Sequence, residues 1–343
     1  MCRWFAYVSE SEECLLDDVL VRPAHSLSKQ VHDHYLPKLL SHSLDPSQDT
    51  TAQEITVRNR LFNIDGLGVA WYTDAAEEFG AVSGQRPALY KTIQAPLNDL
   101  NFRSICANTR SKVCFAHIRA ATSTATTPVN NHPFVFGRHT LMHNGYISDF
   151  VEIKRELCLL LNDDVAASIR GSTDSEHFAA LYMTHLTQGK GSASWEEQYT
   201  TAQMHTALEH TVASIVELQH EKLGARAQPS DLNVATTDGS RLVAIRFRNH
   251  EHTQPPSLYF STTAGVTLNR KYPDHPDGKA NPSPARAAKD HGSHIIVASE
   301  PSTYHDKDWT LIEKNQSVLV ETDGGVRLSQ IDYPRDYAVR PKE

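Results

Sequence analysis

Cysteine at position 2 is the first residue of this sequence whose type and place could do chemistry. An initiator Met before so small a residue is readily removed, which would leave Cys2 with a free α-amino group. That amine has an ordinary pKa near ~8, close to the ~8.5 of a thiol, so one residue would supply both nucleophile and general base. The alternative is a cysteine that is simply packed in a first buried strand.

A second candidate is His143-Asn144-Gly145, which follows an apolar run at residues 140–142. Asn-Gly is a favoured turn dipeptide because both residues tolerate positive φ, so a plain turn is the simplest interpretation. The same pair could instead direct the Asn144 side-chain N–H and the Gly145 backbone N–H toward one point. Two such donors form an oxyanion hole for a tetrahedral intermediate.

Two charged residues could hold the ends of an α-amino acid. Arg119 follows the apolar run 113–118, and its planar fork can bind a carboxylate in two places. Asp174, in Ser172-Thr173-Asp174, could pair with an ammonium group. Each has a simpler interpretation, an exposed charge for the arginine and ordinary helix capping for the acidic segment.

Composition excludes several other classes of function. The net charge is −8 with no basic run, which argues against binding nucleic acid or an anionic membrane. No secretory signal or spanning apolar segment is recognisable, so we expect a cytoplasmic protein. The cysteines form no Cys-x-x-Cys pair, and the many histidines form no metal-binding helix motif, so we expect no metal.

The elements that must position these residues read as strands, then helices, then strands. The expected strands are residues 4–8, 68–72, 88–92, 113–118, 140–142, 232–235, 242–247, 257–260, 294–298 and 317–320, and the expected helices are 150–161, 175–186 and 195–219. This order predicts an α+β fold of two mostly antiparallel sheets with helices outside. We expect one domain over residues 2–330, insertions at about 41–56 and 271–292, and a tail at 331–343.

Six segments in this order resemble the class II glutamine amidotransferases of the N-terminal-nucleophile hydrolase superfamily. They cover roughly residues 2–180 and are Cys2-Arg3-Trp4, Asp65-Gly66-Leu67-Gly68, His117-Ile118-Arg119, Asn130-Asn131-His132-Pro133, His143-Asn144-Gly145 and Ser172-Thr173-Asp174-Ser175-Glu176. Within this class the sequence is most similar to the fungal Dug-pathway amidotransferase subunits of glutathione degradation. Residues 22–26 and 65–72 carry that closer similarity.

The resemblance implies a four-layer αββα fold and a set of residue roles. Cys2 would be the nucleophile without any cofactor, Asn144 and Gly145 the oxyanion hole, Arg119 the ligand of the substrate α-carboxylate, Asp174 the ligand of its α-amino group, and Thr122 and His132 part of the pocket wall. The sequence departs from the family at Ile64, where glycine is usual, and at Tyr146, where a small residue is common. Both departures bear on substrate preference.

The implied activity is hydrolysis of a γ-glutamyl amide through a Cys2 thioester. Glutathione, cleaved to glutamate and cysteinylglycine, is the first expected substrate, and a metallopeptidase-like protein is the implied partner. Three alternatives stay open at this point. They are a glutaminase that supplies ammonia to a separate synthase, a hydrolase of another γ-glutamyl metabolite, and a non-catalytic regulatory subunit.

Overall fold

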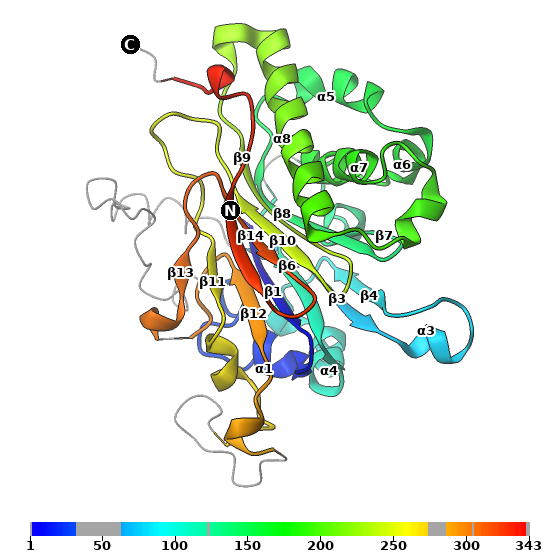
Figure 1. Cartoon of the computed structure of the whole chain (residues 1–343), viewed down its shortest axis with the longest axis vertical. Coiled ribbons are helices and arrows are strands. Elements are labelled where there is room, and N and C mark those ends of the chain that lie inside the picture. Colours follow the sequence, from blue (N-terminus) through cyan, green and yellow to red (C-terminus); the bar gives the residue numbers. More distant parts are fainter. Residues whose placement is uncertain (1, 32–62, 122–123, 274–285, 304, 341–343) are drawn as a thin grey trace.

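Two antiparallel sheets lie face to face, and helices cover their outer sides (Figure 1). The computed structural model describes residues 2–31, 63–121, 124–273, 286–303 and 305–340. Within these residues the prediction of an α+β, four-layer αββα fold is confirmed.

The first sheet contains the N-terminal strand that begins directly after Cys2. Its strand order is β13-β11-β12-β1-β6-β3-β4, with β1 (Arg3–Ser9), β3 (Leu67–Thr73), β4 (Arg86–Thr92), β6 (Val113–Ile118), β11 (Tyr259–Ser261), β12 (His294–Ala298) and β13 (Thr310–Leu311). Strand β1 lies between β6 and β12 and pairs antiparallel with both. The strand that carries Cys2 is therefore held on two sides.

The second sheet contains the Asn-Gly segment. Its strand order is β15-β14-β10-β9-β8-β7, with β7 (Phe134–Phe136), β8 (His139–Tyr146), β9 (Asp231–Thr237), β10 (Leu242–Arg246), β14 (Gln316–Val320) and β15 (Val326–Gln330). A separate small ladder pairs β2 (Cys14–Leu15) with β5 (Arg110–Ser111).

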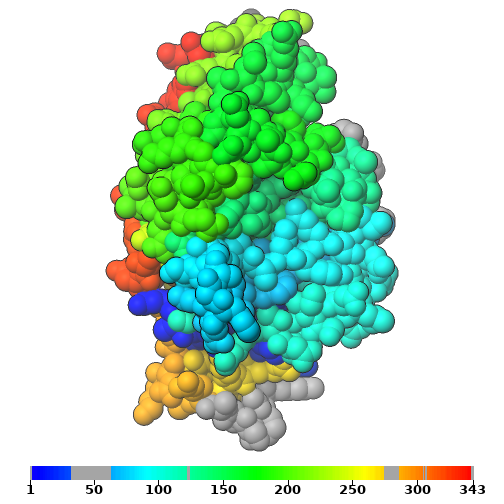
Figure 2. All heavy atoms as spheres, turned by 90° about the vertical axis from the view of Figure 1, so that its right-hand side faces the viewer, coloured from blue at the N-terminus to red at the C-terminus, as the bar shows by residue number. Residues whose placement is uncertain are grey.

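Helices form the two outer layers. They are α1 (Leu16–Leu20), α3 (Ala75–Glu78), α4 (Leu100–Asn108), α5 (Phe150–Leu159), α6 (Asp163–Ser168), α7 (Asp174–Leu186) and α8 (Thr201–Leu223). Helices α5, α7 and α8 pack on the second sheet, whereas α1 and α4 pack on the first. Figure 2 shows the face where the green helical layer meets the cyan β3–β4 hairpin, and there Arg86 Nε lies 2.7 Å from Glu196 Oε2.

The alternation of side chains along β1 explains why the strand is buried throughout. Phe5 and Tyr7 pack in the core between the first sheet and its helices. Trp4, Ala6 and Val8 point the other way, into the core between the two sheets. Successive side chains of a strand point to opposite faces, so a continuous apolar run is what a strand covered on both faces requires.

Two sequence-based predictions of element boundaries were wrong. The run expected as a helix over 195–219 becomes helical only at Thr201, because Thr200 caps it in a capping box with Gln203. The strand expected over 140–142 continues to Tyr146, so Asn144-Gly145 is part of β8 and not a turn. Pairing with β9 overrides the local turn preference.

The predicted insertions and tail lie only partly within the described residues. The segment 41–56 lies outside them. The other insertion, 271–292, has described ends that meet, since Tyr272 stacks on His291 with ring centroids 3.5 Å apart. At the C-terminal end, Val339 donates its N–H to Asn249 O at 2.9 Å.

Candidate active site

Cys2 is fixed by hydrogen bonds on the residues around it. Its Sγ accepts from the Ala120 N–H at 3.4 Å. Next along the chain, the Trp4 N–H donates to Ser299 Oγ at 3.0 Å, while the Ser299 N–H donates to Trp4 O at 3.0 Å. The Trp4 indole N–H reaches Asn233 O of the second sheet at 3.3 Å. The thiol is thus placed where the two sheets meet.

The surroundings of Cys2 favour a neutral thiol at rest. Burial raises the pKa of the Cys2 thiol, and the hydrogen bond from Ala120 and the charge of Arg119 offset this only in part. A thiol with a raised pKa needs a base to become a nucleophile.

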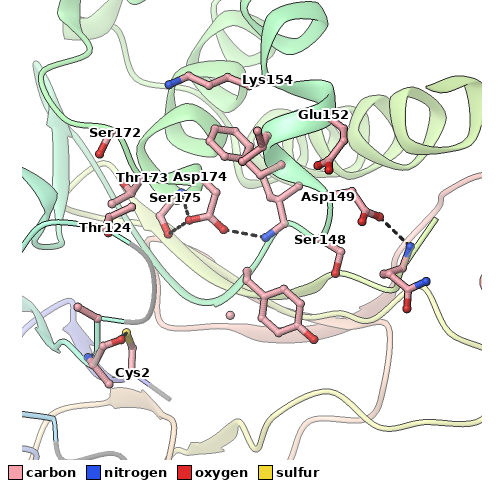
Figure 3. Close-up of a pocket in the computed structure, with 18 of the residues that line it drawn as sticks. Cys2, Thr124, Ser148, Asp149, Glu152, Lys154, Ser172, Thr173, Asp174 and Ser175 are labelled. Atoms are coloured by element: carbon pink, nitrogen blue, oxygen red, sulfur yellow. Dashed lines mark hydrogen bonds between the residues drawn. The ribbon is translucent and has the colours of Figure 1, made fainter. Parts of the chain in front are cut away.

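A cavity of about 1180 Å³ opens beside Cys2. Predicted site residues that line it are Cys2, Arg119, His132, Gly145 and Asp174. Figure 3 shows Cys2 at one side of this cavity, Thr173, Asp174 and Ser175 along another wall, and Ser148 and Asp149 far from the thiol. Segments more than a hundred residues apart in sequence therefore meet around one space.

Arg119 is buried, with 4 % of its surface exposed, which contradicts the interpretation as an exposed charge. Its guanidinium donates to Ala125 O at 3.0 Å and to Thr124 Oγ1 at 2.5 Å. Within the described residues no carboxylate lies within ion-pair distance of it. A buried guanidinium held by neutral acceptors keeps its charge available for an anionic ligand.

The Asp65-Gly66 turn holds the backbone around Arg119. The Arg119 N–H donates to Gly66 O at 2.9 Å, and the Asp65 N–H donates to Arg119 O at 3.2 Å. The Asp65 carboxylate accepts from the Ala121 N–H at 2.8 Å. This turn therefore fixes the same short segment that contacts the Cys2 thiol.

Gly145 occupies a backbone conformation that only glycine accepts readily. Its φ is 148°, and a Cβ built there would lie 1.9 Å from Asp231 O. Asn144, next to it in β8, is 3 % exposed, and its Oδ1 is buried without a hydrogen-bond partner among the described residues. An unpartnered buried acceptor is costly for the fold, but an oxyanion hole would use the amide N–H of Asn144 and not this oxygen.

Asp174 is the first residue of α7, with Thr173 as its N-cap. One carboxylate oxygen accepts from the Ile147 N–H at 2.8 Å, and the other from the Ser175 N–H at 2.8 Å. The capping interpretation is correct for Thr173, whose Oγ1 accepts from the Glu176 N–H at 3.1 Å. Asp174 itself ties α7 to the end of β8 and faces the cavity.

Three buried histidines, His117, His132 and His143, lie at the cavity wall or behind it, and His132 lines the cavity. His117 Nε2 donates to His143 O at 3.2 Å, and the His132 ring lies 4.1 Å from the His117 ring. Burial lowers the pKa of His117 to about 3 and lowers the pKa of His132 well below its ordinary value. His117 and His132 are neutral at pH 7. His117 is a packed, hydrogen-bonded support, whereas both ring nitrogens of His132 are buried without a partner among the described residues.

The site in the structure differs from the predicted set of residues in three ways. Thr122 lies outside the described residues, and Asn144 is adjacent to the cavity without lining it. Sequence reasoning missed the roles of Ala120 and Ser299 in holding Cys2. Ser299 directly follows the strand expected over 294–298, but its pairing with Trp4 spans nearly the whole chain, and no local pattern predicts it.

The described residues contain no group of three or more His, Cys, Asp or Glu side chains that could hold a metal ion. The described part of the chain likewise has no helix that is both long and apolar enough to cross a membrane.

Comparisons with known proteins agree on one family. Residues 37–250 match the family model of the class II glutamine amidotransferases. The chain is 31 % identical over 326 residues to the probable glutamine amidotransferase DUG3 of Saccharomyces cerevisiae, covering 94 % of this chain and 82 % of that protein. It is also 30 % identical over 183 residues to a glutamine–fructose-6-phosphate aminotransferase of Corynebacterium efficiens, covering 52 % of this chain and 26 % of that protein.

Solved structures show the same fold. A glutamine aminotransferase class-II domain protein from Silicibacter pomeroyi superposes with a TM-score of 0.57 at 19 % identity, over 96 % of this chain and 100 % of that one. The glutamine phosphoribosylpyrophosphate amidotransferase of B. subtilis gives a TM-score of 0.52 at 12 % identity, over 97 % of this chain and 50 % of that one.

Proposed function

We propose, from the premise that this chain belongs to the class II glutamine amidotransferases, that it hydrolyses a γ-glutamyl amide, with glutathione as substrate. The products would be glutamate and cysteinylglycine. The observation that carries the proposal is the shared cavity of Cys2, Arg119, Gly145 and Asp174. A thiol, a carboxylate ligand, a backbone donor and an ammonium ligand are what a γ-glutamyl thioester mechanism requires.

The first half of the reaction forms the thioester. After removal of Met1, the Cys2 α-amino group takes the thiol proton, and the thiolate attacks the γ-carbonyl carbon. The carbonyl oxygen becomes an oxyanion, to which the Asn144 amide and the Gly145 N–H donate; one such donor is typically worth ~10²–10³ in rate. The C–N bond then breaks, and the leaving nitrogen takes the proton from the Cys2 ammonium.

The second half releases glutamate. Water attacks the thioester carbon while the Cys2 amine takes a water proton, and the same oxyanion hole holds the new intermediate. The C–S bond breaks and the thiol is restored with its proton. Throughout, Arg119 would hold the substrate α-carboxylate and Asp174 its α-ammonium, with Thr122 and His132 part of the wall.

The direct test is glutamate release from glutathione and from glutamine, with Cys2→Ala as control and with intact mass confirming loss of Met1. Release from glutathione that disappears in Cys2→Ala supports the proposal. Release from glutamine alone points to a glutaminase that feeds a separate synthase, a reading favoured by the similarity to the aminotransferase. No release from either by processed protein would leave another γ-glutamyl metabolite or a regulatory subunit.

Two further proposals rest on the resemblance to the fungal subunits. We infer a metallopeptidase-like protein partner, which should co-purify with a C-terminally tagged chain; its absence from such a preparation would count against it. We also infer a cytoplasmic location, which the same tag tests by microscopy. The tag must be C-terminal, because an N-terminal one would block the Cys2 amine.

A further inference from the structure

The wall of the cavity beyond the oxyanion segment carries an arginine that the proposed mechanism does not use. Tyr146 ends β8 and pairs with Asp231 of β9, and Asp231 in turn bridges to Arg248. Residues directly opposite in neighbouring strands point to the same face. Asn144 lies two positions before Tyr146, so it shares that face as well.

Arg248 is held rigidly but keeps donors free for a ligand. Its Nη1 lies 2.5 Å from Asp231 Oδ1, and its Nε donates to Thr253 Oγ1 at 2.7 Å. A guanidinium has five N–H donors in a fixed fork, so these contacts orient it without exhausting it. The side chain is 15 % exposed, and Arg248 lines the cavity together with Tyr146.

Arg248 is charged at neutral pH. Burial lowers the pKa of its guanidinium, but Asp231 and the Tyr146 hydroxyl outweigh this and raise the pKa. The cation is thus a permanent feature of this wall.

The position of Arg248 suits a leaving group larger than ammonia. Its backbone lies two strand spacings from that of Tyr146, or roughly 10 Å at about 4.8 Å each. Arg248 lines the same cavity as Cys2, but β9 separates it from the oxyanion segment, so a group bound there must extend along the cavity wall. Ammonia, the leaving group of glutamine, has no carboxylate for a guanidinium to bind.

The charges of the cavity also match such a substrate. A γ-glutamyl peptide with a free C-terminus carries two carboxylates and one ammonium. Six charged residues line the cavity, the cations Arg119, Lys154 and Arg248 and the anions Asp149, Glu152 and Asp174. Among them, Arg119, Arg248 and Asp174 can supply one partner for each of the three charges of such a substrate. Glutamine, with one carboxylate and one ammonium, would leave Arg248 without a partner in the ligand.

We propose that Arg248 binds the terminal carboxylate of the leaving peptide, so that the cavity selects γ-glutamyl peptides with a free C-terminal carboxylate over glutamine. This inference rests on the proposed function and assigns it a substrate class. Arg248 is then a residue that determines substrate specificity. Tyr146 forms the cavity wall between Arg248 and the oxyanion segment, at a position where the family commonly has a small residue.

The test compares glutathione with its C-terminal glycine amide, which differs only in the carboxylate. For the unaltered protein we expect kcat/KM to favour glutathione by about tenfold to a hundredfold, the usual worth of a hydrogen bond to a charged group. Removing Arg248 alone would leave the Asp231 carboxylate, 7 % exposed, without its cation. The variant is therefore Arg248→Met with Asp231→Asn, in which the preference should fall to about one.

A matched pair provides the control. Arg241 and Asp238 form a similar buried pair outside the cavity, with Arg241 Nη1 3.0 Å from Asp238 Oδ2 and side chains 20 % and 0 % exposed. Arg241→Met with Asp238→Asn should keep the full preference for glutathione. Should the first double variant not fold, Arg248→Lys retains the charge without the fork and should show an intermediate preference.

The possible failures can be told apart. Cleavage of glutathione and its amide at equal rates, or a preference that survives in the Arg248 variants, would overturn the Arg248 inference and leave the proposed function standing. Cleavage of glutamine with neither glutathione nor its amide would overturn the proposed function itself, and the inference with it.

Discussion

The two ends of the cavity are built differently. Around Cys2 the groups are buried and fixed by backbone hydrogen bonds, as in the Ala120, Gly66 and Ile147 contacts. Toward the start of α5 the wall is open, with Tyr146 44 % and Val151 85 % exposed. Steps common to all γ-glutamyl substrates need the rigid end, whereas the open end can differ between substrates without disturbing the reacting atoms.

Gly145→Ala should reduce activity the most, because it changes the backbone at the rigid end of the cavity, next to the reacting atoms. The added Cβ would meet Asp231 O, so β8 must shift and displace an oxyanion donor. We expect kcat/KM to fall by about 10²–10³-fold, measured as glutamate release.

The control is Gly189→Ala, where φ is also positive, at 72°, but nothing lies within 4 Å of the added atom. It should cost on the order of 1–2 kcal/mol of stability and leave activity intact. Equal activity losses in the two variants would contradict this account of Gly145.

Asp174→Asn should have the next largest effect. The amide keeps one of the two acceptor oxygens, so either the Ile147 or the Ser175 N–H loses its acceptor, and the side chain no longer offers a charge to the substrate ammonium. We expect kcat/KM to fall by about tenfold to a hundredfold through KM. Asp164→Asn is the matched control, since that first-turn acid of α6 accepts from the Ser192 N–H at 2.6 Å outside the cavity. If both variants kept full activity, Asp174 would be only a structural residue.

The histidines behind the rigid end should make stability fall in mild acid. The pKa of His117 is about 3 in the folded protein against ~6.5 unfolded, so below pH 6.5 the unfolded state binds more protons. Stability is then full above pH 6.5 and declines as pH falls, by roughly 2 kcal/mol at pH 5 for His117 alone. Urea unfolding between pH 5 and 7 measures this slope.

His117→Gln removes that titration and should flatten the slope. The control is His252→Gln, because His252 is exposed, with 67 % of its side chain accessible. It should keep the slope of the unaltered protein. An unchanged slope in His117→Gln would assign the acid sensitivity to other groups.

Ser299→Ala should have the smallest effect. It removes the acceptor of the Trp4 N–H and loosens the strand that positions Cys2, at a cost of about 1 kcal/mol. We expect kcat to fall severalfold while KM stays constant, and Ser299→Thr to restore kcat. A change in KM alone would mean that Ser299 does not act through Cys2.

The sequence predicts the rigid end better than the open end. Strands β1 and β6 are mostly apolar and buried along their whole length, and Cys2 directly precedes β1 while Arg119 directly follows β6. Helix α4 was missed because only Phe102 and Cys106 of its residues are buried, which leaves almost no periodic signal. The Arg248–Asp231 pair was missed because it forms between strands, and no local pattern records such a contact.

The thioester on Cys2 is the central claim, and trapping it is the most direct test. Protein mixed with glutathione and quenched in acid should carry one glutamyl group on its N-terminal peptide, with Met1 absent and the group removed by hydroxylamine. Cys2→Ala should carry none. Glutamate release without any adduct on Cys2, or full activity in protein that retains Met1, would contradict the account.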